Sequence, residues 1–296
     1  MAANSLDAAR QVKHRAWTVW PHTRSVYRRT IDLGYRTQSA IRPYHFDLDR
    51  HRDAYGDVPR MYFLHRSAPD RPQRSKTVRQ RIFCFWTGDN ALTPGRKRGL
   101  QALRSSQPDT EVVLVTARTL KDWILPDHPL HVCYESLSLV HRSDYLRAYF
   151  MAYFGGGYTD IKRPTGNWLQ RFEMFRDPTV WLAGYAEKSS RSCGGDDHTK
   201  LGQDIHRNYG RLVSISAFIM RSGTPFACEW LQEVERRLDY YQEDLLQHPG
   251  GTWGDEPGYP LRWIEIGSDV YHPLQLKCLE HVRRSQALLP VLEGHR

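Results

Sequence analysis

The chain has 296 residues, of which 40% are hydrophobic and 12% aromatic, enough to bury one sizeable core or two modest ones. Its five cysteines are widely spaced and form no C-x-x-C pair, which argues against a disulfide framework and a thiolate zinc site and favours a reducing compartment. The first thirty residues hold no apolar run as long as a signal peptide or membrane span requires. We therefore expect a soluble, cytoplasmic protein.

The net charge of +9 comes from the N-terminal part of the chain. Residues 1–81 contain 17 basic and 7 acidic side chains, whereas the remainder contains 25 basic and 26 acidic ones. A basic segment of this kind concentrates anions and could hold the protein at an anionic membrane surface or near an acidic polymer. A solvated, partly ordered extension is the alternative.

The clearest change of composition lies at 67–80, a stretch rich in Arg, Ser and Pro. We place the domain boundary there, with a basic, partly helical extension at 1–80 and a globular domain at 81–296. No internal repeat or low-complexity tract interrupts either part.

The globular domain begins with a strand, a helix and a second strand. Residues 81–86 are short, apolar and aromatic, which is typical of a buried strand. Thr93 followed by Pro94 predicts a helix start, because Thr can accept from free N–H groups and Pro needs no donor at the first position. Residues 111–116 predict the second strand. This order with short connections indicates an α/β fold with a mainly parallel, Rossmann-like sheet flanked by helices.

The next helix carries charged residues on one face. Residues 136–154 have helical apolar spacing, and Asp144 lies three positions before Arg147, so the two share a neighbouring face. Ser143 lies four positions before Arg147. Glycines at 155–157 permit a left-handed exit from this helix.

Asp160 lies near the end of the following strand, which we predict at 158–161. Ligands of open α/β sheets bind at the carboxyl ends of strands, so this carboxylate is a candidate site residue. Farther along, we expect strands at 180–185 and 212–220, a helix from Thr224 and Pro225, a lid or surface loop at 249–260, a strand at 262–266 and a helix from His272.

Two segments carry a resemblance to a known family: Ser143-Asp144-Tyr145-Leu146-Arg147, and Gly155-Gly156-Gly157-Tyr158-Thr159-Asp160-Ile161-Lys162. They resemble the S-D-x-L-R helix and G-G-x-Y-x-D-x-D strand of DXD glycosyltransferases. More narrowly, they are similar to the capsular-polysaccharide-synthesis branch, related to yeast-type initiating mannosyltransferases and clostridial glucosylating toxins. Supporting matches are Phe85-Trp86-Thr87-Gly88, Trp263-Ile264-Glu265-Ile266 and His272-Pro273. The resemblance covers about 81–277.

The resemblance implies a GT-A fold and transfer of a sugar from a UDP- or GDP-sugar to a glycan acceptor in capsule or cell-surface polysaccharide synthesis, with retention of anomeric configuration. It implies that Trp86 lies by the base, Asp144 by ribose or sugar hydroxyls, and Arg147 by phosphate. The chemistry of these side chains suits those roles, since an indole stacks on a base and a guanidinium donates paired hydrogen bonds to phosphate.

The other donor-binding residues that the resemblance implies stand in the same motifs. They are Thr87, Gly88, Ser143, Gly156, Gly157, Tyr158 and Glu265. Carboxylates that are candidates for contacting sugar or acceptor are Asp196, Asp197, Glu265 and Asp269.

Asp160 matches the first Asp of the DXD motif, which holds Mn²⁺ or Mg²⁺ against the donor diphosphate through hard oxygen ligands. The second Asp is replaced by Lys162, and Arg163 follows. Either a metal ion is still held by Asp160, the diphosphate and a distant side chain such as His272, or Lys162 and Arg163 neutralise the leaving group. We favour a metal-assisted site, with Asp160, Asp144, Arg147 and Lys162 as the catalytic set.

Two other functions fit parts of the sequence. A nucleic-acid or anionic-polymer binder would use the N-terminal arginines with interleaved aromatic residues, such as Trp17 and Trp20. A catalytically silent nucleotide-sugar binder is suggested by Lys162. The group at 193–198, with one Cys, two Asp and one His, lacks zinc-site spacing. For a glycosyltransferase we expect no nucleic-acid partner.

Overall fold

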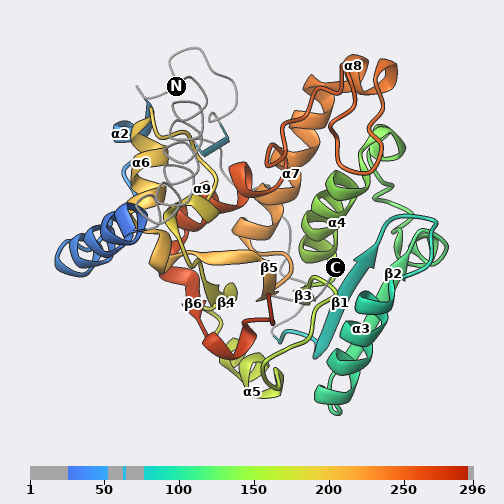
Figure 1. Ribbon diagram of the computed structural model, residues 1–296, viewed down its shortest axis with the longest axis horizontal. Coiled ribbons are helices and arrows are strands. Elements are labelled where there is room, and N and C mark those ends of the chain that lie inside the picture. Colours follow the sequence, from blue (N-terminus) through green and yellow to red (C-terminus); the bar gives the residue numbers. More distant parts are fainter. Residues whose placement is uncertain (1–25, 53–62, 65–76, 293–296) are drawn as a thin grey trace, which may run out of the picture. The chain divides into compact units, whose positions relative to one another are not determined.

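The computed structural model describes residues 26–52, 63–64 and 77–292 (Figure 1). The chain divides into two compact units, 1–45 and 46–296, so its division lies well before residue 80. The described part of the first unit, 26–45, contains a helix at 26–41. The short helix α2 (Leu48–Arg52) belongs to the second unit, where Arg50 Nε lies 2.7 Å from Asp204 Oδ2 on α6 (Lys200–Arg207). Trp17 and Trp20 lie outside the described residues.

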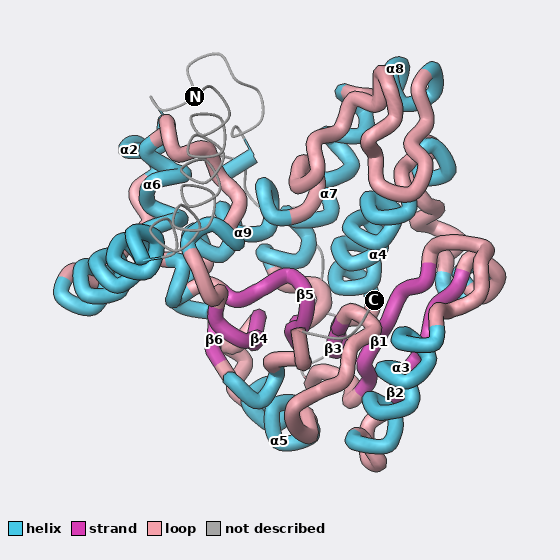
Figure 2. Tube along the Cα trace, viewed as in Figure 1, coloured by secondary structure: helices cyan, strands magenta, loops and turns pink. Residues whose placement is uncertain are grey.

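A six-stranded sheet runs through the second unit in the order β2-β1-β3-β5-β4-β6 (Figure 2). The strands are β1 (Arg81–Trp86), β2 (Glu111–Thr116), β3 (Gly156–Thr159), β4 (Leu182–Ala186), β5 (Val213–Met220) and β6 (Val282–Arg284). β1 pairs in parallel with β2 and β3, and β4 with β6, whereas β5 is antiparallel to both its neighbours. The expected mainly parallel α/β sheet is therefore confirmed, with one reversed strand.

The described helices of the sheet unit, besides α2 and α6, are α3 (Pro94–Ser106), α4 (Leu139–Tyr153), α5 (Leu169–Phe172), α7 (Pro225–Tyr240), α8 (Gln242–Gln247) and α9 (Ser268–Lys277). The two predicted cap-and-proline starts are confirmed: the Thr93 and Thr224 side chains accept from backbone N–H groups at the starts of α3 and α7. No described helix is both long enough and apolar enough to cross a bilayer.

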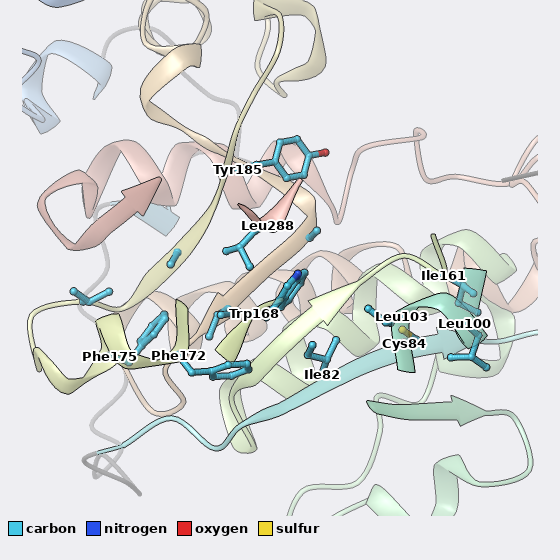
Figure 3. Packing of buried hydrophobic residues seen from close by; sticks show 14 residues of the cluster. Ile82, Cys84, Leu100, Leu103, Ile161, Trp168, Phe172, Phe175, Tyr185 and Leu288 are labelled. Atoms are coloured by element: carbon cyan, nitrogen blue, oxygen red, sulfur yellow. The ribbon is translucent and has the colours of Figure 1, made fainter. Parts of the chain in front are cut away.

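Helices cover both faces of the sheet. Side chains alternate between the two faces along each strand, so apolar side chains on each face pack against helices. Ile82 and Cys84 of β1 face one layer, where they pack with Leu100 and Leu103 of α3 and with Trp168 (Figure 3). On the other face, Phe83 meets Phe150 of α4, with ring centroids 4.9 Å apart. Burial on both faces explains why β1 is apolar at successive positions.

Two expected elements differ in the structure. The third strand begins at Gly156 and ends at Thr159, not 158–161, because Gly155 turns the chain with a φ of 62° and Gly156 already lies against the backbone of β1. The predicted strand at 262–266 is wrong: its backbone forms turns, with Glu265 N donating to Arg262 O at 2.9 Å. α9 follows from Ser268, four residues before the expected start at His272.

Candidate functional site

One edge of the sheet gathers the polar residues that follow its strands. β1, β3 and β4 run in the same direction, so Thr87, Asp160 and Glu187 all emerge at this carboxyl edge. The reversed strand β5 begins here, and Ser216 O accepts a hydrogen bond from Asp160 N at 2.9 Å. Because the carboxyl ends of parallel strands are where open α/β sheets bind ligands, this edge is the candidate site.

Tyr158 links the two predicted motifs at that edge. The Arg147 guanidinium lies over the Tyr158 ring, 4.9 Å from its centroid, and Arg147 Nη1 donates to Asp144 Oδ1 at 2.5 Å. On the other side, the Tyr158 hydroxyl donates to Asp160 Oδ1 at 2.8 Å. Ser143 also hydrogen-bonds Tyr158. The helix Asp and Arg are thus joined to the strand-end Asp through one aromatic side chain.

Lys162 completes this arrangement, which we call the edge cluster: Asp144, Arg147, Asp160 and Lys162. Lys162 Nζ lies 2.9 Å from Asp160 Oδ2, and both residues lie beyond the end of β3 at Thr159. The turn that carries Lys162 is fastened to α3, because Arg96 Nη1 donates to Ile161 O at 2.8 Å. The residue Arg163 is exposed.

The two carboxylates of the edge cluster have opposite pKa shifts. Burial raises the pKa of Asp144, and the Arg147 charge offsets this only in part. Burial also acts to raise the pKa of Asp160, but the charges of Lys162 and Arg147 and the hydrogen bonds to Asp160 outweigh it, so that pKa is lowered. Asp160 is therefore held ionised, while Asp144 is the more easily protonated of the two.

A turn from the C-terminal part of the chain closes on Asp144. A Cβ atom on Gly267 would lie 3.2 Å from Asp144 Oδ2, so this turn packs directly against the carboxylate. Arg262 holds the turn by ion pairs with Glu265 at 2.6 Å and Asp269 at 2.9 Å. No motif in the sequence marks Gly267 as a site residue.

The predicted residues at the end of β1 tie that strand to α4. Thr87 Oγ1 donates to Leu139 O at 2.7 Å, and a Cβ on Gly88 would lie 3.1 Å from Leu139 Cδ1. Trp86 is half-buried, packs against the core and donates from Nε1 to Asn90 O at 2.6 Å. All three lie at the same edge as Asp160.

Other predicted residues are not brought to the edge cluster. Gly156 and Gly157 begin β3, at the end away from Asp160, and a Cβ on Gly157 would lie 3.0 Å from the Trp168 ring. Asp196 Oδ1 accepts from His198 N at 2.9 Å, and Asp197 Oδ1 lies 2.5 Å from His206 Nδ1. These two aspartates organise their own loop.

His272 and Glu265 are fully buried in the α9 region. His272 Nδ1 accepts from Gly194 N at 2.9 Å, so Nε2 carries a ring proton, 3.3 Å from Glu187 Oε1. Glu187 is not among the residues predicted from the sequence, although its position directly after a parallel strand is the kind of signal that identified Asp160.

The residues present do not fit a divalent ion held by Asp160 and His272. Both Asp160 oxygens accept hydrogen bonds, from Tyr158 and Lys162, and His272 Nδ1 uses its lone pair on Gly194. Within 26–52, 63–64 and 77–292, no three His, Cys, Asp or Glu side chains gather into a possible metal site. The group at 193–198 is included in that result.

The edge cluster has the chemistry of an anion and polyol site. Its carboxylates can accept from hydroxyls, and its guanidinium and ammonium can donate to phosphate oxygens. No protein-family model matches the sequence, and no curated protein matches it either. The geometry of the edge cluster is therefore the basis on which we assign a function.

Proposed function

We propose that this protein is a GT-A-type glycosyltransferase that moves a sugar from a UDP- or GDP-sugar to a glycan acceptor. The supporting observation is the edge cluster: the Asp144 and Arg147 pair of α4 is joined through Tyr158 to Asp160 at the carboxyl end of β3. Four of the residues that carry the resemblance to DXD glycosyltransferases, Asp144, Arg147, Tyr158 and Asp160, thus lie together at the edge where such a sheet binds ligands.

In this proposal each charged group has a separate task. Asp144 accepts from vicinal hydroxyls of the ribose or the sugar, Arg147 and Lys162 donate to the diphosphate, and Asp160 positions Lys162. Trp86 stacks on the base. Positive charge aimed at the diphosphate stabilises the leaving group as its negative charge develops.

The transfer needs no protein nucleophile. The bond between the sugar C1 and the diphosphate oxygen breaks, and its electron pair stays on the diphosphate. The acceptor hydroxyl oxygen bonds to C1 through an oxocarbenium-like state, and its proton passes to the departing diphosphate. With retention of configuration, as the resemblance implies, the new bond forms on the face that the diphosphate leaves.

Capsule or cell-surface polysaccharide synthesis is the process in which we place this reaction. A basic N-terminal segment beside an anionic membrane would keep the enzyme near such an acceptor.

The test is a thermal-shift panel of UDP-, GDP-, CMP- and dTDP-sugars, each with Mn²⁺ and with chelator. Nucleotide sugars of one base class should raise the midpoint of thermal unfolding, because a ligand at 100 times its Kd adds about 2.7 kcal/mol to the free energy of unfolding. That donor should then be turned over by the parent protein and not by the Asp160→Ala variant. Absence of stabilisation by every donor would refute the proposal.

A silent nucleotide-sugar binder is the second candidate, favoured by the ion pair between Lys162 and Asp160. It predicts the same stabilisation without release of the nucleoside diphosphate. Coupled detection of the released diphosphate separates the two functions.

A further inference from the structure

We propose that Lys162 is a built-in cation that binds the donor diphosphate, so that the site works without a divalent metal ion. This inference rests on the proposed function and names how that site holds its donor. It also replaces the metal-assisted site that the sequence led us to expect.

The charge of the edge cluster supports this assignment. Asp144 and Asp160 contribute two negative charges, and Arg147 and Lys162 two positive ones, so the formal sum is zero. With Asp at position 162 the sum would be −2. The difference of two charges equals the charge of one divalent ion, which means that Lys162 supplies at this position what a metal ion would otherwise have to supply.

The hydrogen-bonding capacity of the cluster also suits an anion. The Lys162 ammonium group carries three N–H donors. Among the described residues, its hydrogen-bond acceptor is Asp160. Arg147 Nε is buried and has no hydrogen-bond acceptor within the described part of the chain. Unused donors match phosphate oxygens, whereas both oxygens of Asp160 already accept hydrogen bonds.

Lys162 is also held in place before any ligand arrives. Its side chain is 11% exposed, and the adjoining backbone is fastened to α3 through Ile161 O and by the close approach of Gly99. A fixed cation stabilises a developing negative charge without a reorganisation cost, as a bound metal ion does. Asp160, at 27% exposure, brings the pair to the surface of the edge.

Titration calorimetry on the full chain tests this, with UDP and GDP as probes, each in Mn²⁺ and in EDTA. The nucleoside diphosphate that binds should do so in EDTA within about twofold of its affinity in Mn²⁺. The Lys162→Ala variant should bind it about 10- to 100-fold more weakly in both solutions, because it loses one charge-assisted contact.

The Lys162→Asp variant gives the sharpest outcome. This variant should bind the nucleoside diphosphate weakly in EDTA and regain affinity in Mn²⁺. It alone should bind Mn²⁺ without nucleotide, as followed by the electron paramagnetic resonance of the ion. Arg176→Asp, at an exposed arginine before β4 on the opposite edge of the sheet, makes the same charge change and should behave like the parent. If Lys162→Asp fails to fold, Lys162→Ala and the charge-conserving Lys162→Arg decide.

The outcomes separate this inference from the proposed function. Binding by the parent only in Mn²⁺, or a Lys162→Ala variant equal to the parent in EDTA, overturns the built-in cation and leaves the glycosyltransferase proposal standing. Failure of every nucleoside diphosphate and nucleotide sugar to bind, with metal and without, overturns the glycosyltransferase proposal itself.

Discussion

Two buried charge networks in this protein contain similar ion pairs but lie at different places in the fold. The edge cluster joins α4 to the end of β3 and reaches solvent at Asp160. The second network, which we call the inner network, has Glu233, Arg237 and Glu265 at its centre, and Arg236 and Arg262 pair with its two glutamates from the surface side. It joins α7 to the turn before α9, with Arg237 Nε 2.7 Å from Glu233 Oε1 and the three central side chains at most 2% exposed.

The comparison shows that burial and pairing of charges do not by themselves identify a site. Arg237 Nη1 also donates to the backbone carbonyl of Glu265 at 2.5 Å, so the inner network directs its donors at its own chain. The edge cluster lies at strand ends and keeps donors that no described residue uses. We therefore expect the first network to govern ligand binding and the second to govern stability.

The largest expected effect is at Asp160. Replacement by Asn should reduce donor turnover by about 10²- to 10³-fold, because the charge that holds Lys162 toward the diphosphate is lost. Steady-state release of the nucleoside diphosphate measures this. Asp109→Asn, an exposed carboxylate before β2 at the opposite edge of the sheet, is the control and should keep parental turnover. Equal rates for the two variants would remove Asp160 from the site.

A substitution in the inner network should change the free energy of unfolding and not the binding of ligand. Arg237→Met removes the cation that Glu233 and Glu265 share, although each keeps a second arginine partner, so the free energy of unfolding should fall by about 2 kcal/mol. Chemical denaturation measures the loss, and nucleotide titration of the folded protein should give the parental affinity. A variant of unchanged stability and weakened nucleotide binding would reverse the assignment of the two networks.

Gly267→Ala tests the contact between Asp144 of the edge cluster and the turn that carries Glu265 of the inner network. The added methyl would lie 3.2 Å from Asp144 Oδ2, so it should displace the carboxylate and weaken donor binding several-fold, at a stability cost of about 1 kcal/mol. Gly34→Ala adds the same methyl group where nothing lies within 4 Å, and should leave donor affinity unchanged. Calorimetric titration of both variants makes the comparison.

The smallest effect concerns pH. The pKa of Asp160 is lowered in the fold, so its ionised form stabilises the protein above the ordinary carboxyl value of about 3.9, and this contribution disappears as pH falls through the lowered pKa. The stability difference between the parent and Asp160→Asn should therefore shrink below pH about 4. Unfolding midpoints from pH 3 to 7 test this, and a difference that grows toward acid would contradict it.

The elements whose causes are local were predictable from the sequence. β1 and β2 have the expected bounds, because short apolar runs bounded by turn residues need only a sheet to join. The Thr-Pro starts of α3 and α7 depend on hydrogen bonds within the first turn of each helix. The pairing of Asp144 with Arg147 likewise follows from helical spacing alone.

Tertiary contacts decided the rest. The reversed strand β5 between β3 and β4, the turn that places Gly267 on Asp144, and the burial of His272 beside Glu187 all join residues far apart in the chain. The strand expected at 262–266 is replaced by turns in which the backbone carbonyl of Glu265 accepts a hydrogen bond from Arg237 of the distant helix α7, while Arg262 holds the same turns locally. The sequence by itself determined which short segments could be strands or helices and which charges share a face. Only packing of distant segments determined which of those charges face an open edge and which are closed inside, because that depends on partners that local spacing does not specify.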